Sequence, residues 1–366
     1  MEVKINNFKK LYTSAKEEID SAIQEVLNSW EYIKWKQDVL FEEEFAKKNW
    51  SKYCVWVWNW LDALKISLLA LWVWKWDEVI TTSHSAIATT LAILEVWAEP
   101  VFVDVDKYSC IDTSLIEEKI TDKTKAIMPV HIYWNSCNMK EMKEICDKYN
   151  LYLIEDCAQS HFTEYNWIKL WNYWDTWCFS FYPSKNIWAF WDAWCIVTNN
   201  EELYEKCKLI SNYWHKIKYK HIVLWMNSRL DEIQAAILRV QLKHIDDYNK
   251  RRQEIAWKYI EWLKWIKEIQ VPEIRDNSTH TFHLFVIQCE RREELMNYLQ
   301  EKWIESMVHY PISIHHQPVF NWKYENYNLP VLDNQVQKNL SLPMNHFLTD
   351  EEVDYVISNI REFYNH

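Results

Sequence analysis

The stretch Val55-Trp56-Val57-Trp58-Asn59-Trp60-Leu61-Asp62-Ala63-Leu64 joins a short apolar segment to an apolar helical run. The segment Tyr53 to Val57 predicts a strand, and the run from Leu61 to Leu71 predicts a helix. A strand followed directly by a helix is typical of βαβ units and a parallel sheet. Tryptophan stands on both sides of Asn59 in the turn between them, where glycine is the usual residue.

Tryptophan in place of glycine is a feature of the whole chain, because its 366 residues include 25 tryptophans and no glycine. Glycine ordinarily makes up about 7 % of a protein, which is close to the fraction of tryptophan here. Tryptophans also stand where glycine is favoured: after helical runs at Trp72 to Trp76 and at Trp97, and in the turn-like pair Asn49-Trp50. We predict that tryptophan replaces glycine throughout, and that the chain as printed neither folds stably nor is active. The alternative is a true tryptophan-rich protein with aromatic platforms for carbohydrate.

Composition excludes several classes of partner. The net charge of −12 argues against a nucleic-acid-binding protein, because such proteins need a basic surface. The nine cysteines include no Cys-x-x-Cys pair, which predicts reduced thiols. The first residues are polar, and no apolar span of 18 residues occurs. We expect a cytoplasmic protein with neither nucleic acid nor membrane as a partner.

Strands and helices alternate through the first two thirds of the chain, which predicts an α/β domain with a mainly parallel seven-stranded sheet. A long helix from Leu230 to about Leu263 then leads to a smaller α+β domain. We place the boundary near residue 250, which gives a large domain over residues 1–250 and a small one over 251–366. The expected strands are Tyr53 to Val57, Glu78 to Thr82, Val101 to Asp104, Ala126 to Val130, Leu151 to Glu155, Cys178 to Phe181 and Cys195 to Thr198.

Three features at strand ends together suggest a cofactor. The turn Trp58-Asn59-Trp60, read with glycine, exposes backbone N–H groups at a helix N-terminus and forms an anion site, although an ordinary tight turn is the alternative. Asp156 ends an apolar strand, where a buried carboxylate needs a cation such as a protonated pyridine nitrogen. Lys185 follows another strand, as an amine near a cofactor would, although most single lysines lie on surfaces. This combination describes a pyridoxal phosphate site.

Four longer segments make the resemblance specific. They are Glu155 to His161, Ser180 to Asn186, Asn227 to Ala236 and Val308 to Pro311, which occur in this order and resemble the DegT/DnrJ/EryC1/StrS sugar aminotransferases. The resemblance runs from about Asn49 to the C-terminus. It implies the fold of aspartate aminotransferase, known as fold type I of the pyridoxal phosphate enzymes. Further tryptophans, in Trp72 to Ile80, Trp134, Trp167 to Asp175, Trp188 to Trp194 and Trp225, also fall on the family's glycines.

The resemblance implies a role for each site residue. Lys185 is the catalytic residue that links covalently to the cofactor, Asp156 holds its ring nitrogen, and Gln159 lies near its hydroxyl. The other cofactor-binding residues implied are Ser180 with Trp58, Asn59 and Trp60 at the phosphate, His84 over the ring, and Asn227 and Arg229, which reach the neighbouring subunit of a homodimer. Many relatives carry an aromatic at the position of Ala86, so this chain departs from them in the residue that stacks on the ring.

The implied substrates are an amino-acid donor, L-glutamate, and a nucleotide-linked keto sugar, with a dTDP-3-keto-6-deoxyhexose favoured over amination at C4. The basic run from His215 to His221 suits a diphosphate, although a solvated loop is the alternative. The expected substrate-binding residues are Lys216, Lys218, Tyr219, Lys220, His309, Tyr310 and His316. The pairs His280/His283 and His315-His316 lack a third ligand at a metal spacing, so we predict no metal.

Two other functions stay open at this point. A sugar 3-dehydratase on the same fold replaces the lysine, so the presence of Lys185 counts against it. A sensor or carbohydrate-binding protein would use the same architecture without catalysis. Loss of the cofactor's absorbance on changing Lys185 to Ala distinguishes an enzyme from a binding protein.

Overall fold

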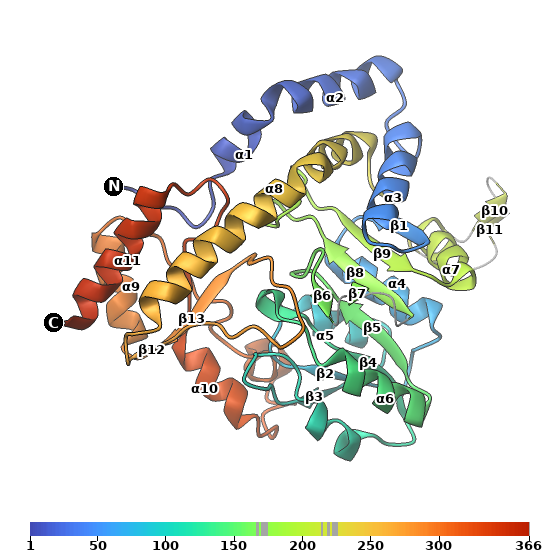
Figure 1. The fold of residues 1–366 in the computed structure, drawn as a ribbon. Coiled ribbons are helices and arrows are strands. Elements are labelled where there is room, and N and C mark those ends of the chain that lie inside the picture. Colours follow the sequence, from blue (N-terminus) through green and yellow to red (C-terminus); the bar gives the residue numbers. More distant parts are fainter. Residues whose placement is uncertain (166–167, 170–174, 214, 218–219, 222–225, 366) are drawn as a thin grey trace.

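A seven-stranded sheet forms the centre of the molecule (Figure 1). The computed structural model describes the chain except for residues 166–167, 170–174, 214, 218–219, 222–225 and 366. β9 pairs antiparallel with both of its neighbours, whereas the other neighbouring pairs are parallel. The spatial order is β1 (Tyr53–Val57), β9 (Trp194–Thr198), β8 (Thr176–Ser180), β5 (Tyr152–Asp156), β4 (Thr124–Met128), β2 (Glu78–Thr82) and β3 (Glu99–Val103).

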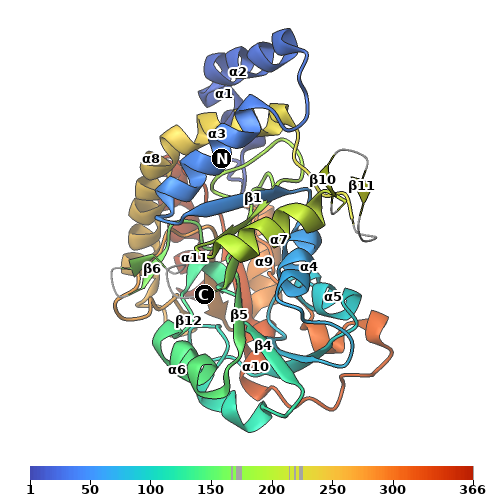
Figure 2. The ribbon, with the colours of Figure 1, turned by 90° about the vertical axis from the view of Figure 1, so that its right-hand side faces the viewer.

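Helices cover both faces of this sheet, and Figure 2 shows them on its two sides. One face packs against α3 (Lys36–Lys48), α6 (Met139–Tyr149) and α8 (Glu232–Leu263). The other face packs against α4 (Trp60–Ala70), α5 (Ala88–Glu95) and α7 (Glu201–Ser211). Each face buries its own apolar cluster, so the strands are hydrophobic on both sides, as parallel sheets require.

The predicted strands are confirmed within one or two residues, and Glu78–Thr82 agrees residue for residue. The pattern of residues from Ser114 to Ile120 predicts a helix, and this prediction is wrong. This segment instead forms two 3₁₀ turns, Thr113–Leu115 and Glu117–Lys119, which follow one another directly. Asp112 caps the first turn through Ser114 N, and a three-residue turn with i→i+3 bonds suits so short a connection.

The C-terminal part builds a second, smaller layer around a three-stranded antiparallel sheet. Its strands are β12 (Ile269–Gln270), β13 (Phe285–Cys289) and β14 (Asn339–Leu342), and its helices are α9 (Arg292–Glu301), α10 (Pro330–Lys338) and α11 (Asp350–Asn365). The predicted boundary near residue 250 falls inside α8, whose residues contribute to the large-domain core at Ile245 and to the small-domain core at Ile255. Val3 joins the small-domain core, and both termini lie on that side of the molecule in Figure 1.

Several short elements complete the described fold. The N-terminal segment forms α1 (Phe8–Ser14) and α2 (Lys16–Ser29), which sequence analysis did not predict. Two hairpins, β6 (Glu164–Tyr165) with β7 (Ile168–Lys169) and β10 (His215–Ile217) with β11 (Lys220–His221), border the undescribed residues. No helix in the described ranges is long and apolar enough to span a bilayer.

One group of tryptophans has the backbone geometry that favours glycine. These residues have φ between 57° and 77°, in the left-handed region where a β-carbon clashes. All of them are exposed, so their rings gain little from burial. Trp30 follows α2 in this conformation, at the helix end where glycine is most common. The group consists of Trp30, Trp50, Trp72, Trp76, Trp97, Trp303 and Trp322.

A second group of tryptophans is buried, with ordinary backbone angles. Trp56 packs 4.5 Å from the ring of Phe41, and Trp188 packs 5.4 Å from that of Phe190. The indole N–H groups of Trp56 and Trp188 have no hydrogen-bond partner among the described residues. A buried donor without a partner costs about 1–3 kcal/mol. These sites therefore conflict with tryptophan through polarity and space rather than through φ.

Candidate active site

The carboxyl ends of β1, β2, β5 and β8 meet at one edge of the central sheet, since these strands run in the same direction. Ligands of parallel sheets bind at this edge. The turn after β1 begins α4 with Asn59 as its N-cap, and the Asn59 side chain accepts a hydrogen bond from Asp62 N at 2.8 Å. Ser228 Oγ accepts from Trp58 N at 2.8 Å and donates to Asp62 Oδ2 at 2.6 Å. Sequence analysis missed Ser228, which fixes this turn from a distant segment.

A cavity of about 630 Å³ opens at this edge, between the central sheet and the small domain. Its wall brings together eight of the predicted residues: Trp58, Asn59, Trp60, Gln159, Ser180, Lys185, His309 and Tyr310. His283, for which the sequence predicted no role at the site, also lines it. Residues as far apart in sequence as Trp58 and Tyr310 thus share one wall, because the small domain lies over the sheet edge.

Lys185 and Asp156 are the charged pair of the site. Lys185 is half-buried, and burial lowers its pKa to about 8 while the Asp156 carboxylate opposes this shift. Asp156 is fully buried, and burial raises its pKa to about 6 against the hydrogen bonds that it accepts and the charge of Lys185. At pH 7 the carboxylate is therefore mostly ionised, and a minor fraction of the amine is unprotonated. An amine and a carboxylate with these pKa values suit proton transfer near neutral pH.

The carboxylate of Asp156 accepts three hydrogen bonds. They come from Thr89 Oγ1 at 2.9 Å, from Ala158 N at 3.1 Å and from Trp60 Nε1 at 3.1 Å. The Trp60 ring stacks on Trp194 with centroids 5.2 Å apart and planes 3° apart. Asp156 is not among the residues that line the cavity, and its Oδ2 already accepts the Trp60 indole N–H.

A polar network ties the cavity to the end of β2. Gln159 Oε1 accepts from Tyr133 N at 2.9 Å, and Gln159 Nε2 donates to the Tyr310 hydroxyl at 3.3 Å. His84 is buried, does not line the cavity, and lies 2.8 Å from the Tyr133 hydroxyl through Nε2. Burial lowers the pKa of His84 to about 4, so its ring is neutral. Tyr133 has φ 54°, and nothing in the sequence around it indicated this linking role.

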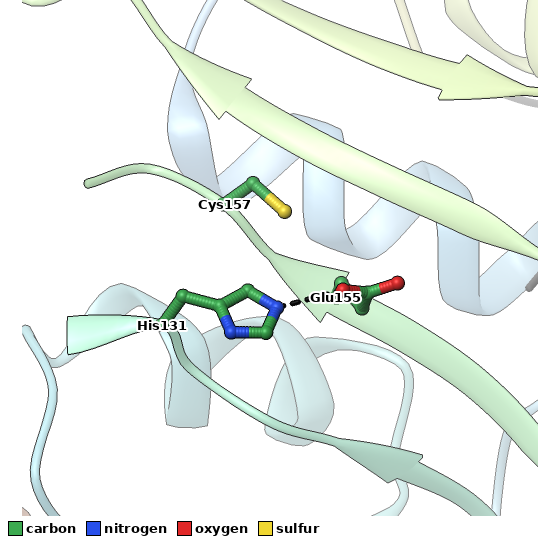
Figure 3. Close-up of side chains that lie close together, drawn as sticks. All are labelled: His131, Glu155 and Cys157. Atoms are coloured by element: carbon green, nitrogen blue, oxygen red, sulfur yellow. Dashed lines mark hydrogen bonds and ion pairs between the residues drawn. The ribbon is translucent and has the colours of Figure 1, made fainter. Parts of the chain in front are cut away.

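A buried trio lies behind Asp156 (Figure 3). His131 Nε2 lies 2.7 Å from Glu155 Oε2, and Cys137 N donates to His131 Nδ1 at 3.1 Å. The indole of Trp177 donates to the other oxygen of Glu155. Cys157 completes the trio, and burial raises the pKa of its thiol. The backbone of His131 donates to Asp156 O at 3.1 Å, so this trio holds the strand end that carries Asp156.

Some predicted residues lie away from this cavity. Asn227 is exposed, Arg229 approaches Asn212 Oδ1 at 3.4 Å, and neither lines the cavity. His316 lies on a 3₁₀ turn, and its ring is 3.7 Å from Asp333. Lys216 and Lys220 lie on the β10–β11 hairpin, and their side chains are not described. Lys218 and Tyr219 fall outside the described residues.

Residues 13–361 match the DegT/DnrJ/EryC1/StrS aminotransferase family. The chain belongs to this family. It is 41% identical over 349 residues to the dTDP-3-amino-3,6-dideoxy-alpha-D-galactopyranose transaminase of Aneurinibacillus thermoaerophilus, covering 94% of this chain and 95% of that one. The predicted resemblance is thus confirmed over nearly the whole chain.

Two solved structures extend the match to the fold. The S. venezuelae protein DesV, in complex with a ketimine intermediate, superposes with a TM-score of 0.97 at 34% identity, covering 100% of this chain and 99% of that one. The Bacillus subtilis protein NtdA, with bound cofactor PMP, gives a TM-score of 0.93 at 30% identity and coverages of 100% and 86%. The expected fold type is therefore confirmed for the mainly parallel sheet and its small partner layer.

The residues at the cavity fit pyridoxal phosphate in part. Lys185, Gln159, Ser180 and Tyr310 are the amine and hydrogen-bonding groups that such a cofactor needs, and they surround one cavity. The Trp60 indole does not fit, because its N–H already occupies the carboxylate that would hold a ring nitrogen. Four polar groups that suit the cofactor therefore surround the cavity, whereas the Trp60 indole obstructs the Asp156 carboxylate.

Proposed function

We propose that this chain is a pyridoxal phosphate-dependent aminotransferase that moves the amino group of L-glutamate to a nucleotide-linked keto sugar. The arrangement that carries the proposal is Lys185 beside Asp156 at the sheet edge, above a cavity of about 630 Å³. Pyridoxal phosphate supplies a carbonyl for amine exchange and a protonated ring that withdraws electrons from the reacting carbon. The product serves deoxyamino-sugar and surface polysaccharide biosynthesis.

Different side chains of the protein have different roles in the proposed reaction. Asp156, ionised at neutral pH, holds a positive ring nitrogen, and Thr89 and Ala158 N keep its carboxylate oriented. The Lys185 amine, with its pKa lowered to about 8, accepts a proton at Nζ and returns it to a neighbouring carbon. Ser180 and the turn at Asn59 bind the phosphate, and Gln159 orients the ring hydroxyl.

The sugar substrate that we propose is a dTDP-3-keto-6-deoxyhexose. The A. thermoaerophilus relative is named as a transaminase of a dTDP-3-amino sugar, which supports amination at C3. His309 and Tyr310 on the cavity wall are placed to contact the sugar. The run from His215 to His221 would reach the diphosphate, and Asn227 and Arg229 would complete the partner's site in a cytoplasmic homodimer.

We also propose that the 25 tryptophans occupy glycine positions. The left-handed backbone of seven exposed tryptophans supports this, as does the loss of the Asp156 carboxylate to Trp60. The obstruction at residue 60 then belongs to the substitution and not to the enzyme. Glycine at this position removes the indole and exposes Asp156 to the cavity.

The test is the conversion of a dTDP-3-keto-6-deoxyhexose by the chain with glycine at the 25 positions. We expect a glutamate-dependent amino sugar by mass spectrometry, and no detectable product from the Lys185→Ala variant. Lys52→Ala, at an exposed lysine, is the matched control and should retain full activity. Measuring mass by light scattering tests the dimer.

Other outcomes select other functions. Binding of the sugar nucleotide without conversion, unchanged by Lys185→Ala, would identify a sensor or carbohydrate-binding protein. Loss of a hydroxyl from the sugar without a need for glutamate would identify a dehydratase. An active chain with tryptophan confirmed at residues 58 and 60 would contradict the substitution proposal.

A further inference from the structure

A second cluster of ligating side chains lies outside the cavity, where the 3₁₀ turn Ile314–His316 meets α10. The ligand atoms of His315, His316 and Asp333 all lie within 4.8 Å of one another. Asp333 Oδ1 is 3.8 Å from His315 Nε2 and 3.7 Å from His316 Nε2. The absence of a third ligand led us to predict no metal from the sequence. The fold supplies that ligand from a separate helix.

His315 is oriented as a metal-binding histidine. It is 2 % exposed, and its Nε2 has no hydrogen-bond partner among the described residues. Its Nδ1 lies 2.7 Å from Ser83 Oγ, which also accepts from His315 N at 2.9 Å. With the proton on Nδ1 the ring donates to Ser83 and directs the Nε2 lone pair toward the cluster. Metal-ligating histidines are commonly fixed by such a bond from the other ring nitrogen.

We propose that His315, His316 and Asp333 bind one divalent transition-metal ion of the zinc type, with water as the fourth ligand. Two imidazoles and a carboxylate with an open position form a common zinc set, whereas Mg²⁺ and Ca²⁺ prefer oxygen ligands. Metal–ligand bonds of about 2.0–2.2 Å place tetrahedral ligands about 3.4 Å apart. The two distances of 3.8 and 3.7 Å exceed this by only about 0.4 Å.

The partly exposed ligands can make this adjustment. The side chains of His316 and Asp333 are 42% and 37% exposed, so small rotations are unhindered on their solvent side. Open solvent at these two residues gives a metal ion its path of entry.

Negative charge nearby favours a cation. The carboxylate of Asp333 interacts electrostatically with that of Asp104. Asp104 accepts hydrogen bonds from Val331 N and Leu332 N, both at 2.9 Å, at the start of α10. The nearby cation Lys323 is paired with Glu99 at 2.7 Å. A metal ion would therefore meet two carboxylates at this end of α10.

The buried trio of Figure 3 shows by contrast what a closed cluster looks like. Both ring nitrogens of His131 and both oxygens of Glu155 already have hydrogen-bond partners. A metal ion there would have to displace these bonds in a site without solvent. The His315 cluster has an unused nitrogen and an open side, so the proposal concerns this cluster alone.

A metal at this cluster would connect α10 to the wall of the active site. Ser83, which holds His315, directly follows β2 and precedes His84 of the polar network. Ile314 N also donates to Ser83 O at 3.0 Å. None of the three ligands is a tryptophan, so the site is the same whether tryptophan or glycine occupies the 25 positions.

Titration of the tag-free full chain, with glycine at the 25 tryptophan positions, with Co²⁺ and then in competition with Zn²⁺ tests the proposal. We expect one ion per chain, with the intense visible absorption of four-coordinate Co²⁺. Asp333→Asn and His316→Gln should each weaken binding at least tenfold. His244→Gln is the matched control, because His244 lies 2.9 Å from Glu18 without a third ligand, and its affinity should equal that of the unchanged chain.

Three results would overturn the proposal. The first is the absence of stoichiometric binding by the unchanged chain, and the second is unaltered affinity in both ligand variants. The third is loss of binding in Cys157→Ala with retention in Asp333→Asn, which would assign the ion to the buried trio. Circular dichroism of each variant before titration separates a lost ligand from a lost fold.

Discussion

Trp97 and Trp60 show that tryptophan conflicts with this fold in two different ways. Trp97 follows α5 with φ 65° and is 74% exposed, so its ring has room while its backbone is strained. Trp60 begins α4 with ordinary backbone angles, and its indole N–H donates a hydrogen bond to the Asp156 carboxylate. Glycine serves the first position through its freedom at positive φ and the second through the space that it leaves.

The largest expected effect comes from changing both kinds of position together. A β-carbon in the left-handed region costs about 1 kcal/mol per residue, so the seven exposed tryptophans alone cost about 7 kcal/mol. Total stability is about 5–15 kcal/mol. We expect the chain with glycine at all 25 positions to unfold cooperatively in urea, and the chain as printed to show no such transition. Equal unfolding transitions in the two chains would contradict the prediction that tryptophan destabilises the fold at these positions.

A smaller effect concerns the pH dependence of stability, and it arises at Asp156, the carboxylate that Trp60 contacts. Burial raises the pKa of Asp156 from 3.8 to about 6, so its contribution to stability is complete below pH 3.8 and is lost as the pH rises through 6. The shift corresponds to about 3 kcal/mol at most. In the chain with glycine at the 25 tryptophan positions, Asp156→Asn should remove this dependence in urea unfolding at pH 4 and pH 7. Asp77→Asn, near the exposed tryptophans, should leave it unchanged.

The smallest effects come from single substitutions that compare Trp60 with Trp97. In a chain with glycine at the other 24 tryptophan positions, Trp60→Gly should bind pyridoxal phosphate at least tenfold more tightly than its parent, measured by absorbance titration, because it frees the Asp156 carboxylate. Trp97→Gly, made in the corresponding chain that keeps tryptophan only at residue 97, should leave this affinity unchanged and raise the free energy of unfolding by about 1 kcal/mol. If Trp97→Gly improved cofactor binding as much as Trp60→Gly did, the distinction between strain and obstruction would be wrong.

The sequence predicted what depends on local pattern. Strand ends such as Asp156 and Ser180 follow from apolar runs, and their meeting at one edge follows from parallel order. Ser228 and Asp333 were missed because their partners lie on distant segments that only the tertiary fold brings near. The turns at residues 113–119 were misjudged because a short helical pattern does not distinguish 3₁₀ from α geometry.

The continuous helix α8 limits how the two domains can move. Its 32 residues extend for about 48 Å at 1.5 Å per residue, from the side of the central sheet into the small-domain core. At its start, Glu232 accepts hydrogen bonds from Gln37 N and Asp38 N of α3. A hinge at the domain boundary would have to break successive backbone bonds of this rod. We therefore expect the gap between the two domains to change little in width when substrate binds, in contrast to enzymes whose domains are joined by a flexible linker.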